Sequence, residues 1–254
     1  MSLLSDKSIH KRCVVPNRIF DQAYFDVLVA SQNGKGWPMT DVAISDLRAE
    51  LRRQATREPT AEEQRDFKPM IAPYHPRLLR EVPVGPDGRM LKIISKGQSS
   101  YGYDVTLSPE LRLFTNTFSK IINPKKVDVE KCTVPMELHH DEEFGDYVIM
   151  PPNSYALGRT VEYFHMPRNL TVVCLGKSTY ARVGVAVNVT PIEAGWHGNV
   201  VLEFSNNTNS PVMLFVREGV AQFLFFEGDE DCEVSYDDRG GKYQGQTGIT
   251  HAKV

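Results

Sequence analysis

A short stretch after an apolar run combines the residue types that bind phosphate. Residues 176–179 read GKST and follow the apolar run 170–174, and Arg182 lies five positions beyond Lys177. Hydroxyl and backbone N–H groups can donate to phosphate oxygens while the two cations neutralise their charge. The G-x-x-x-x-G-K-[ST] spacing of a Walker loop is absent. We therefore predict a phosphate-binding loop, with an ordinary solvent-exposed loop as the alternative.

A single carboxylate interrupts a second apolar run. Glu203 lies within residues 200–204, which read VVLEF. A carboxylate rarely enters a β core without a partner, and Arg182 is the partner that we predict. In such a place the carboxylate can have a shifted pKa and serve as general acid and base. The alternative is that the strand alternates and Glu203 faces solvent.

Both candidates need strands to hold them, and β-like runs dominate from Gln98 onward. The runs are Tyr103–Leu107, Tyr147–Met150, Leu170–Cys174, Val183–Val189, Val200–Phe204, Val212–Val216 and Ala221–Phe226. Pro, Gly and Asn turns separate them. This pattern predicts a mainly β domain, a sandwich or a barrel.

The N-terminal part has a different pattern. Residues 1–30 predict a short helix after an extended lead-in. Asp41–Ala55 places apolar residues on one helical stripe, and Thr60-x-x-Glu63 has the form of a capping box. Prolines interrupt residues 69–86, so we expect no long regular element there.

Composition excludes several classes of protein. Of 254 residues, 41% are hydrophobic and 24% charged, as in ordinary globular proteins. The formal net charge of −3 provides no global field that recruits nucleic acid. No apolar run is long enough to span a membrane, and the N-terminus has no secretory signal. The four cysteines lie far apart, which predicts free thiols in the cytoplasm.

Six segments together resemble one known family, that of the dCTP deaminases in the dUTPase-like superfamily. They are SSYGYDV (99–105), PPNSYALGRTVEYF (151–164), GKSTYARVGV (176–185), VNVTPIEAGWHGNVVLEFSN (187–206), GVAQFLFFE (219–227) and VSYDDRGGKYQGQTG (234–248). The resemblance implies one domain over residues 1–254, with a β core (98–236), a nucleotide-closing tail (237–254) and a longer-than-family insertion (31–97). It further implies a distorted β-barrel or jelly roll with helical additions near the N-terminus, assembled as a homotrimer whose active sites lie between subunits.

The resemblance also implies an activity, the hydrolytic deamination of dCTP to dUTP and ammonia. Glu203 would shuttle protons, Arg182 would orient Glu203, and Ser178 would help hold the attacking water. Mg²⁺ would bind through the triphosphate, and dTTP is a possible inhibitor. The implied substrate-binding residues are Lys177, Ser178, Thr179, Tyr180, Ala181, Arg182, Glu193, Val201, Leu202, Glu203, Gln222, Tyr236, Lys242 and Gln246.

Zinc is not expected, because zinc deaminases pair H-x-E with a later P-C-x-x-C. His140-Asp141-Glu142 fits the first pattern, but the chain contains no C-x-x-C. We interpret this tripeptide as part of an acidic surface loop.

Two other functions remain open. A bifunctional deaminase and dUTPase would use the same Glu203 and release dUMP. A non-catalytic nucleotide-binding module could be built on the same fold, although such a module should have lost Glu203 or Arg182.

Overall fold

The computed structural model describes residues 1–13, 68–115, 123–125, 129–250 and 252–253. The chain divides into two compact units, one formed by Met1–Ile9 with Met70–Val254 and the other by His10–Pro69. The predicted helices at Asp41–Ala55 and after Thr60 lie outside the described residues. The larger unit carries all of the candidate site residues.

The described part of the larger unit is mainly β, as predicted, and all of its ladders are antiparallel. Its strands are β1 (Ser2–Leu3), β2 (Ile71–Ala72), β3 (Leu79–Val84), β4 (Arg89–Gln98), β5 (Tyr103–Phe114), β6 (Thr133–Pro135), β7 (His139–Asp141), β8 (Gly145–Met150), β9 (Tyr155–His165), β10 (Leu170–Gly176), β11 (Val185–Asn188), β12 (His197–Asn206), β13 (Val212–Phe215) and β14 (Gly219–Glu227). The helices are α1 (Asp6–Cys13), α5 (Val129–Cys132) and α6 (Ser178–Ala181).

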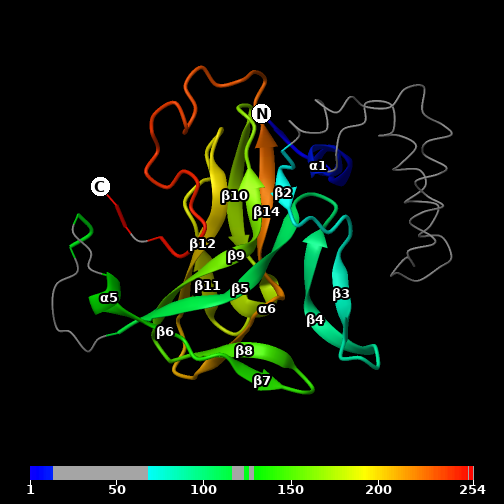
Figure 1. Ribbon diagram of the computed structural model, residues 1–254, viewed down its shortest axis with the longest axis vertical. Coiled ribbons are helices and arrows are strands. Elements are labelled where there is room, and N and C mark those ends of the chain that lie inside the picture. Colours follow the sequence, from blue (N-terminus) through cyan, green and yellow to red (C-terminus); the bar gives the residue numbers. More distant parts are fainter. Residues whose placement is uncertain (14–67, 116–122, 126–128, 251, 254) are drawn as a thin grey trace. The chain divides into compact units, whose positions relative to one another are not determined.

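A large sheet positions the candidate site. Its main path runs β1-β14-β5-β9-β12-β11, and β10 pairs with β14 at a branch (Figure 1). A smaller sheet orders β13-β8-β7. Large buried side chains from four strands of the main sheet form the core, namely Tyr103, Phe164, Phe204, Phe223 and Phe225. The strand of Glu203 therefore lies inside the sheet, between β9 and β11.

All seven predicted runs are strands. The sequence analysis did not predict six further strands, β2, β3, β4, β6, β7 and β9, of which β9 matters most for the site. This strand pairs with β2, β5 and β12 and is central to the sheet. Gly158, Arg159 and Glu162 interrupt its apolar pattern, and for that reason neither alternation nor a continuous apolar run revealed it.

In residues 69–86, where the prolines predict no long regular element, the strands are short: β2 has 2 residues and β3 has 6. The 10-residue β4 begins after the last of these prolines, at Arg89. Pro83 lies in β3, which pairs only with β4 among the described strands. An edge strand tolerates proline because the missing N–H would face away from the ladder.

The N-terminal prediction of an extended lead-in and a short helix is confirmed by β1 and α1. The four cysteines are free thiols. His140 lies in the β7–β8 hairpin with 70% of its side chain exposed, as expected for a surface loop. No helix among the described residues combines the length and hydropathy needed to cross a bilayer.

Candidate active site

Glu203 occupies a half-buried face of β12. The strand alternates, with Leu202 and Phe204 fully buried and Glu203 of intermediate exposure. Its cross-strand neighbours are Leu157 on β9 and Asn188 on β11. Burial raises the pKa of the Glu203 carboxyl to about 7. A carboxyl with this pKa can both accept and donate a proton near neutral pH.

The predicted partnership between Arg182 and Glu203 is not formed within one chain. Arg182 caps the C-terminal end of α6, and its residue is exposed. Among the hydrogen bonds and ion pairs of the described residues, none joins it to Glu203. Ser178, Thr179 and Ala181 are likewise exposed on α6. The loop therefore presents its hydroxyls and its cation outward.

Tyr180 is the exception on this helix. Its side chain is 2% exposed, and its hydroxyl accepts a hydrogen bond from the Phe215 N–H at 2.9 Å. Burial raises the pKa of the phenol. Because the Tyr180 side chain is buried in the core, only the Tyr180 backbone could make the predicted contact with substrate. The sequence did not distinguish it from its polar neighbours.

Lys177 and Gln222 meet at a carboxylate that the sequence analysis did not single out. Lys177 Nζ forms an ion pair with Asp104 Oδ2, and Gln222 Nε2 donates to Asp104 Oδ1 at 3.3 Å. Gln222 Nε2 also donates to Ser99 Oγ at 3.2 Å. Asp104 is 4% exposed. The one sequence feature that pointed to Asp104 was its place in the SSYGYDV segment. A single Asp beside apolar residues is otherwise common at the end of a strand.

A hollow of about 590 Å³ lies beside this loop. Thr179 and Ser95 line it with the cations Arg80 and Lys92. Another hollow, of about 510 Å³, is lined by Lys96, Arg159 and Arg217 among others. Neither hollow includes Glu203. Of these two hollows, the one beside the phosphate-suited loop thus does not reach the candidate proton shuttle.

Val201 and Leu202 lie just after a β-bulge in β12. The pairing of β12 with β9 shifts between Asn199 and Val201. The Leu202 side chain is fully buried, which leaves only its backbone for any contact with a ligand. A bulge of this kind redirects backbone groups locally and is common beside active sites.

The loop that carries Glu193 contacts the residues around the start of the tail. Arg239 forms an ion pair with Glu193, and both side chains are about half exposed. The Tyr236 N–H donates to the Ala194 carbonyl at 2.9 Å, and the Tyr236 hydroxyl accepts from the Tyr243 N–H at 3.1 Å. These contacts bring the Glu193 loop and the start of the tail together.

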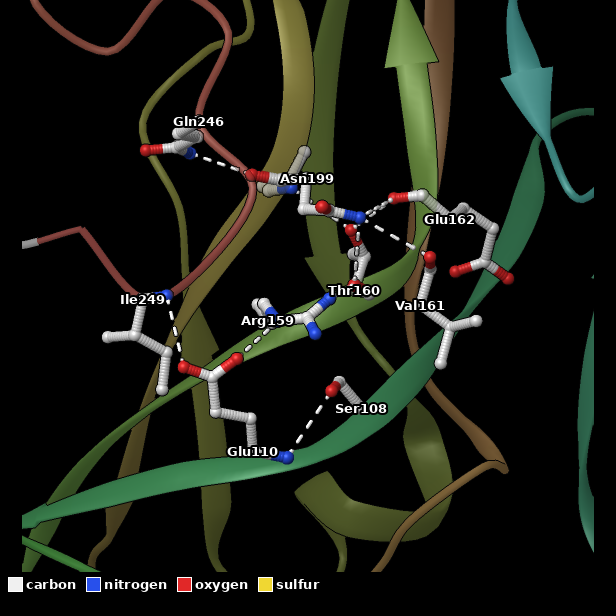
Figure 2. A network of polar contacts seen from close by, with 10 residues as sticks. Ser108, Glu110, Arg159, Thr160, Val161, Glu162, Asn199, Gln246 and Ile249 are labelled. Carbon is white, nitrogen blue, oxygen red and sulfur yellow. Dashed lines mark hydrogen bonds and ion pairs between the residues drawn. The ribbon is translucent and has the colours of Figure 1, made fainter.

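The two remaining predicted residues lie farther along the tail. Lys242 is exposed, and its Nζ donates to the Lys253 carbonyl at 2.7 Å. Gln246 Nε2 donates to the Asn199 carbonyl at 2.8 Å (Figure 2). The tail contains no helix or strand in its described residues but makes many contacts with β12, which its polar sequence did not predict.

Glu162 is a second buried carboxylate that the sequence analysis missed. It is fully buried on β9 and accepts hydrogen bonds from the Thr106 N–H at 3.0 Å and from Thr106 Oγ1 at 2.6 Å. Burial raises the pKa of Glu162 to about 7, although the bonds from Thr106 oppose that rise. Its carboxylate borders the smaller hollow described above.

This raised pKa predicts how stability depends on pH. A group whose folded-state pKa exceeds its unfolded value stabilises the fold below the unfolded pKa, and that contribution is lost as pH rises toward the folded pKa. Relative to Glu162→Gln, the wild type should lose about 3 kcal/mol of unfolding free energy between pH 4.5 and 8. Urea unfolding at several pH values measures this, with exposed Glu137→Gln as the control. A parallel pH dependence of the wild type and Glu162→Gln would contradict the assignment.

Sequence comparisons match this chain to known proteins. The family model described as dCTP deaminase-like matches residues 78–228. A dCTP deaminase from Laribacter hongkongensis is 56% identical over 181 residues, 71% of this chain and 89% of the relative. One from Acinetobacter baylyi is 56% identical over 185 residues, 73% of this chain and 91% of the relative.

A solved structure gives a weaker likeness. The 2'-deoxycytidine 5'-triphosphate deaminase from Agrobacterium tumefaciens matches 51% of this chain and 39% of its own at 17% identity, with a TM-score of 0.38. That likeness is too partial to bear on the assignment. The sequence matches suffice, since they span most of each relative at more than half identity. On these matches, the chain belongs to the dCTP deaminase family.

Proposed function

We propose that this protein catalyses the hydrolytic deamination of dCTP to dUTP and ammonia. The observation that carries the proposal is Glu203, a half-buried carboxyl whose pKa lies near 7, within a chain that belongs to this family. Deamination requires a nucleophilic water at C4, a proton on N3 and a proton for the departing amine. One desolvated carboxylate can supply all three transfers.

In the proposed reaction, Glu203 takes a proton from the water while the water oxygen bonds to C4. The proton passes to N3, giving a tetrahedral intermediate. Glu203 then transfers the hydroxyl proton to the exocyclic amine, the C4–N bond breaks, and ammonia leaves as the C4 carbonyl forms. Ser178 holds the water and Arg182 orients Glu203. Water is the only co-reactant, so atoms and protons balance.

The remaining candidate residues bind the nucleotide in this proposal. Lys177, Thr179 and Ala181 approach the phosphates from the α6 loop, and Gln222, Lys242, Gln246 and Tyr236 complete the nucleotide site. The Glu193 carboxylate accepts a hydrogen bond from the deoxyribose 3′-hydroxyl. To do so, it gives up its ion pair with Arg239 or keeps that ion pair alongside the new bond. The backbone of Val201 and Leu202 reads the pyrimidine edge. dTTP, which shares the sugar and triphosphate, inhibits by occupying this site.

We further propose a homotrimer with each active site between subunits. The exposed loop with Arg182 and the half-buried Glu203 are not bonded to each other in one chain, which a site completed by a neighbouring subunit explains. Light scattering should give three times the 28.7 kDa chain mass. The fraction of trimer should track activity on dilution. A monomer with full activity would refute the proposal.

The proposed cation is Mg²⁺, held by the triphosphate of the substrate, since Mg²⁺ in proteins is often bound through substrate phosphates. Activity should survive a zinc-selective chelator and fall when Mg²⁺ is withdrawn. Stoichiometric zinc lost together with activity would contradict zinc independence.

One incubation separates this function from its two alternatives. The protein is mixed with dCTP and Mg²⁺, and the nucleotides are separated by chromatography. Accumulation of dUTP with equimolar ammonia supports the deaminase. Continued conversion to dUMP would establish the bifunctional enzyme, and unchanged dCTP that nevertheless binds would establish a nucleotide-binding module.

A further inference from the structure

Four residues, Trp196 and the first three residues of β12 (His197–Asn199), receive the C-terminal tail. We refer to Trp196–Asn199 as the dock. Trp196 Nε1 donates to the Tyr243 carbonyl at 3.0 Å. The His197 N–H donates to Gln244 Oε1 at 3.2 Å, and the Gly245 N–H donates to the His197 carbonyl at 2.9 Å. The first two dock residues therefore bond three successive tail residues.

Asn199 holds the next part of the tail through its backbone. Its N–H donates to the Gln246 carbonyl at 2.8 Å, and its carbonyl accepts from Gln246 Nε2 at 2.8 Å (Figure 2). Gly198 and Gln246 also form a parallel β-bridge. Gln246 is thus fixed at both its backbone and its side chain.

Gly198 leaves the space that this close approach requires. A Cβ atom at position 198 would lie 2.9 Å from the Gln246 carbonyl oxygen and 3.1 Å from its nitrogen. The φ angle of Gly198 is +149°, a conformation that residues with a side chain rarely adopt. The dock is therefore shaped for tail backbone as well as bonded to it.

The Asn199 side chain fixes the dock from behind. Its Nδ2 donates to the carbonyls of Thr160, Val161 and Glu162 at 3.3, 3.3 and 2.9 Å. Only 7% of Asn199 is exposed. The same residue therefore joins central strand β9 on one side and the tail on the other, as Figure 2 shows.

We infer that the dock is the receptor of the tail and that Gly198 and Asn199 are positioning residues for nucleotide binding. The strand that begins in the dock carries Glu203 four residues beyond Asn199, about 13 Å along β12. Seating Gln246 on Asn199 holds the tail within reach of a nucleotide bound beside Glu203. The role in binding rests on the proposed function; the docking itself does not.

The test uses two full-length variants and a matched control. Gly198→Ala inserts the clashing Cβ on the dock side. On the tail side, Gln244→Ala removes the Oε1 acceptor of the His197 N–H, at a residue that has no assigned role in nucleotide binding. Gly88→Ala is the control: Gly88 also has a positive φ, +70°, but a Cβ there meets nothing within 4 Å. It lies in the turn between β3 and β4, away from the tail contacts.

Hydrogen exchange of the nucleotide-free protein tests the docking. Exchange at residues 243–249 should accelerate by about 10-fold in both variants, as expected for losing a hydrogen bond or its geometry. Residues 200–206 should keep wild-type exchange, as should both segments in Gly88→Ala. Unchanged exchange at residues 243–249 in Gln244→Ala would overturn the inference, even if Gly198→Ala does not fold.

Kinetics test the role in nucleotide binding. Each variant should raise the KM for dCTP by about 10-fold while kcat changes by less than about threefold. Because both act through one docked state, the double variant should show about the same 10-fold rise. A multiplicative rise of about 100-fold would overturn the coupling. A wild type without deaminase activity would remove the proposed function, while hydrogen exchange would still decide the docking.

Discussion

Replacing Glu203 with glutamine is expected to abolish deamination while leaving dCTP binding largely intact. Glutamine is nearly isosteric and still forms hydrogen bonds, but it cannot carry a proton between water, N3 and the amine. Loss of general acid–base catalysis should lower kcat by at least roughly 10²–10⁴-fold. Single-turnover assays measure the rate, and calorimetric titration with dCTP and Mg²⁺ measures binding.

The pH profile of the wild type gives an independent check of the same residue. Burial raises the pKa of Glu203 to about 7. As a base, the carboxyl must be ionised before it can take the water's proton, so kcat/KM should fall as pH drops below about 7. A wild-type profile flat from pH 5 to 8, or substantial turnover by Glu203→Gln, would remove Glu203 from the mechanism.

The sequence predicted seven of the strands correctly because their signal is local. Alternating or continuous apolar runs bounded by turn residues identify a strand without knowledge of its partners. β9 was missed because it carries Glu162 and Arg159, whose burial and pairing depend on other strands. A long-range contact such as the bond between Thr106 and Glu162 leaves no periodic trace in either segment.

The candidate site was predictable in residue types but not in pairings. Glu203 was found because a carboxylate in an apolar run is unusual. The same logic did not identify Asp104 on β5, which forms an ion pair with Lys177, 73 residues away in the sequence. Lys177, Glu193 and Gln246 were expected to contact nucleotide, yet each has a partner within the chain. Binding must therefore exchange or share these contacts, which no single segment reveals.

The tail is the segment in which contacts that the sequence did not predict have the largest expected consequence. A polar, glycine-rich terminus alone predicts a chain end without a role in the core. In the structure its residues contact the dock and Glu193. Arg168 also holds the root of the tail, through an ion pair with Asp238 at 2.8 Å and a hydrogen bond to the Glu233 carbonyl at 2.8 Å. A truncation can therefore remove the outer tail, residues 242–254, and leave the root of the tail, residues 233–241, in place.

Removing residues 242–254 should lower kcat/KM by about 10²-fold or more, because Lys242 and Gln246 are lost and water enters the site. The Arg168–Asp238 and Glu193–Arg239 ion pairs remain, so the fold should persist and the melting temperature should fall by less than about 8 °C. Light scattering should also find the proposed trimer unchanged. In the full-length protein, proteases should cut the tail more slowly with dCTP and Mg²⁺ than without. Full activity after truncation, or equal cleavage in both states, would show that the tail does not close over the nucleotide.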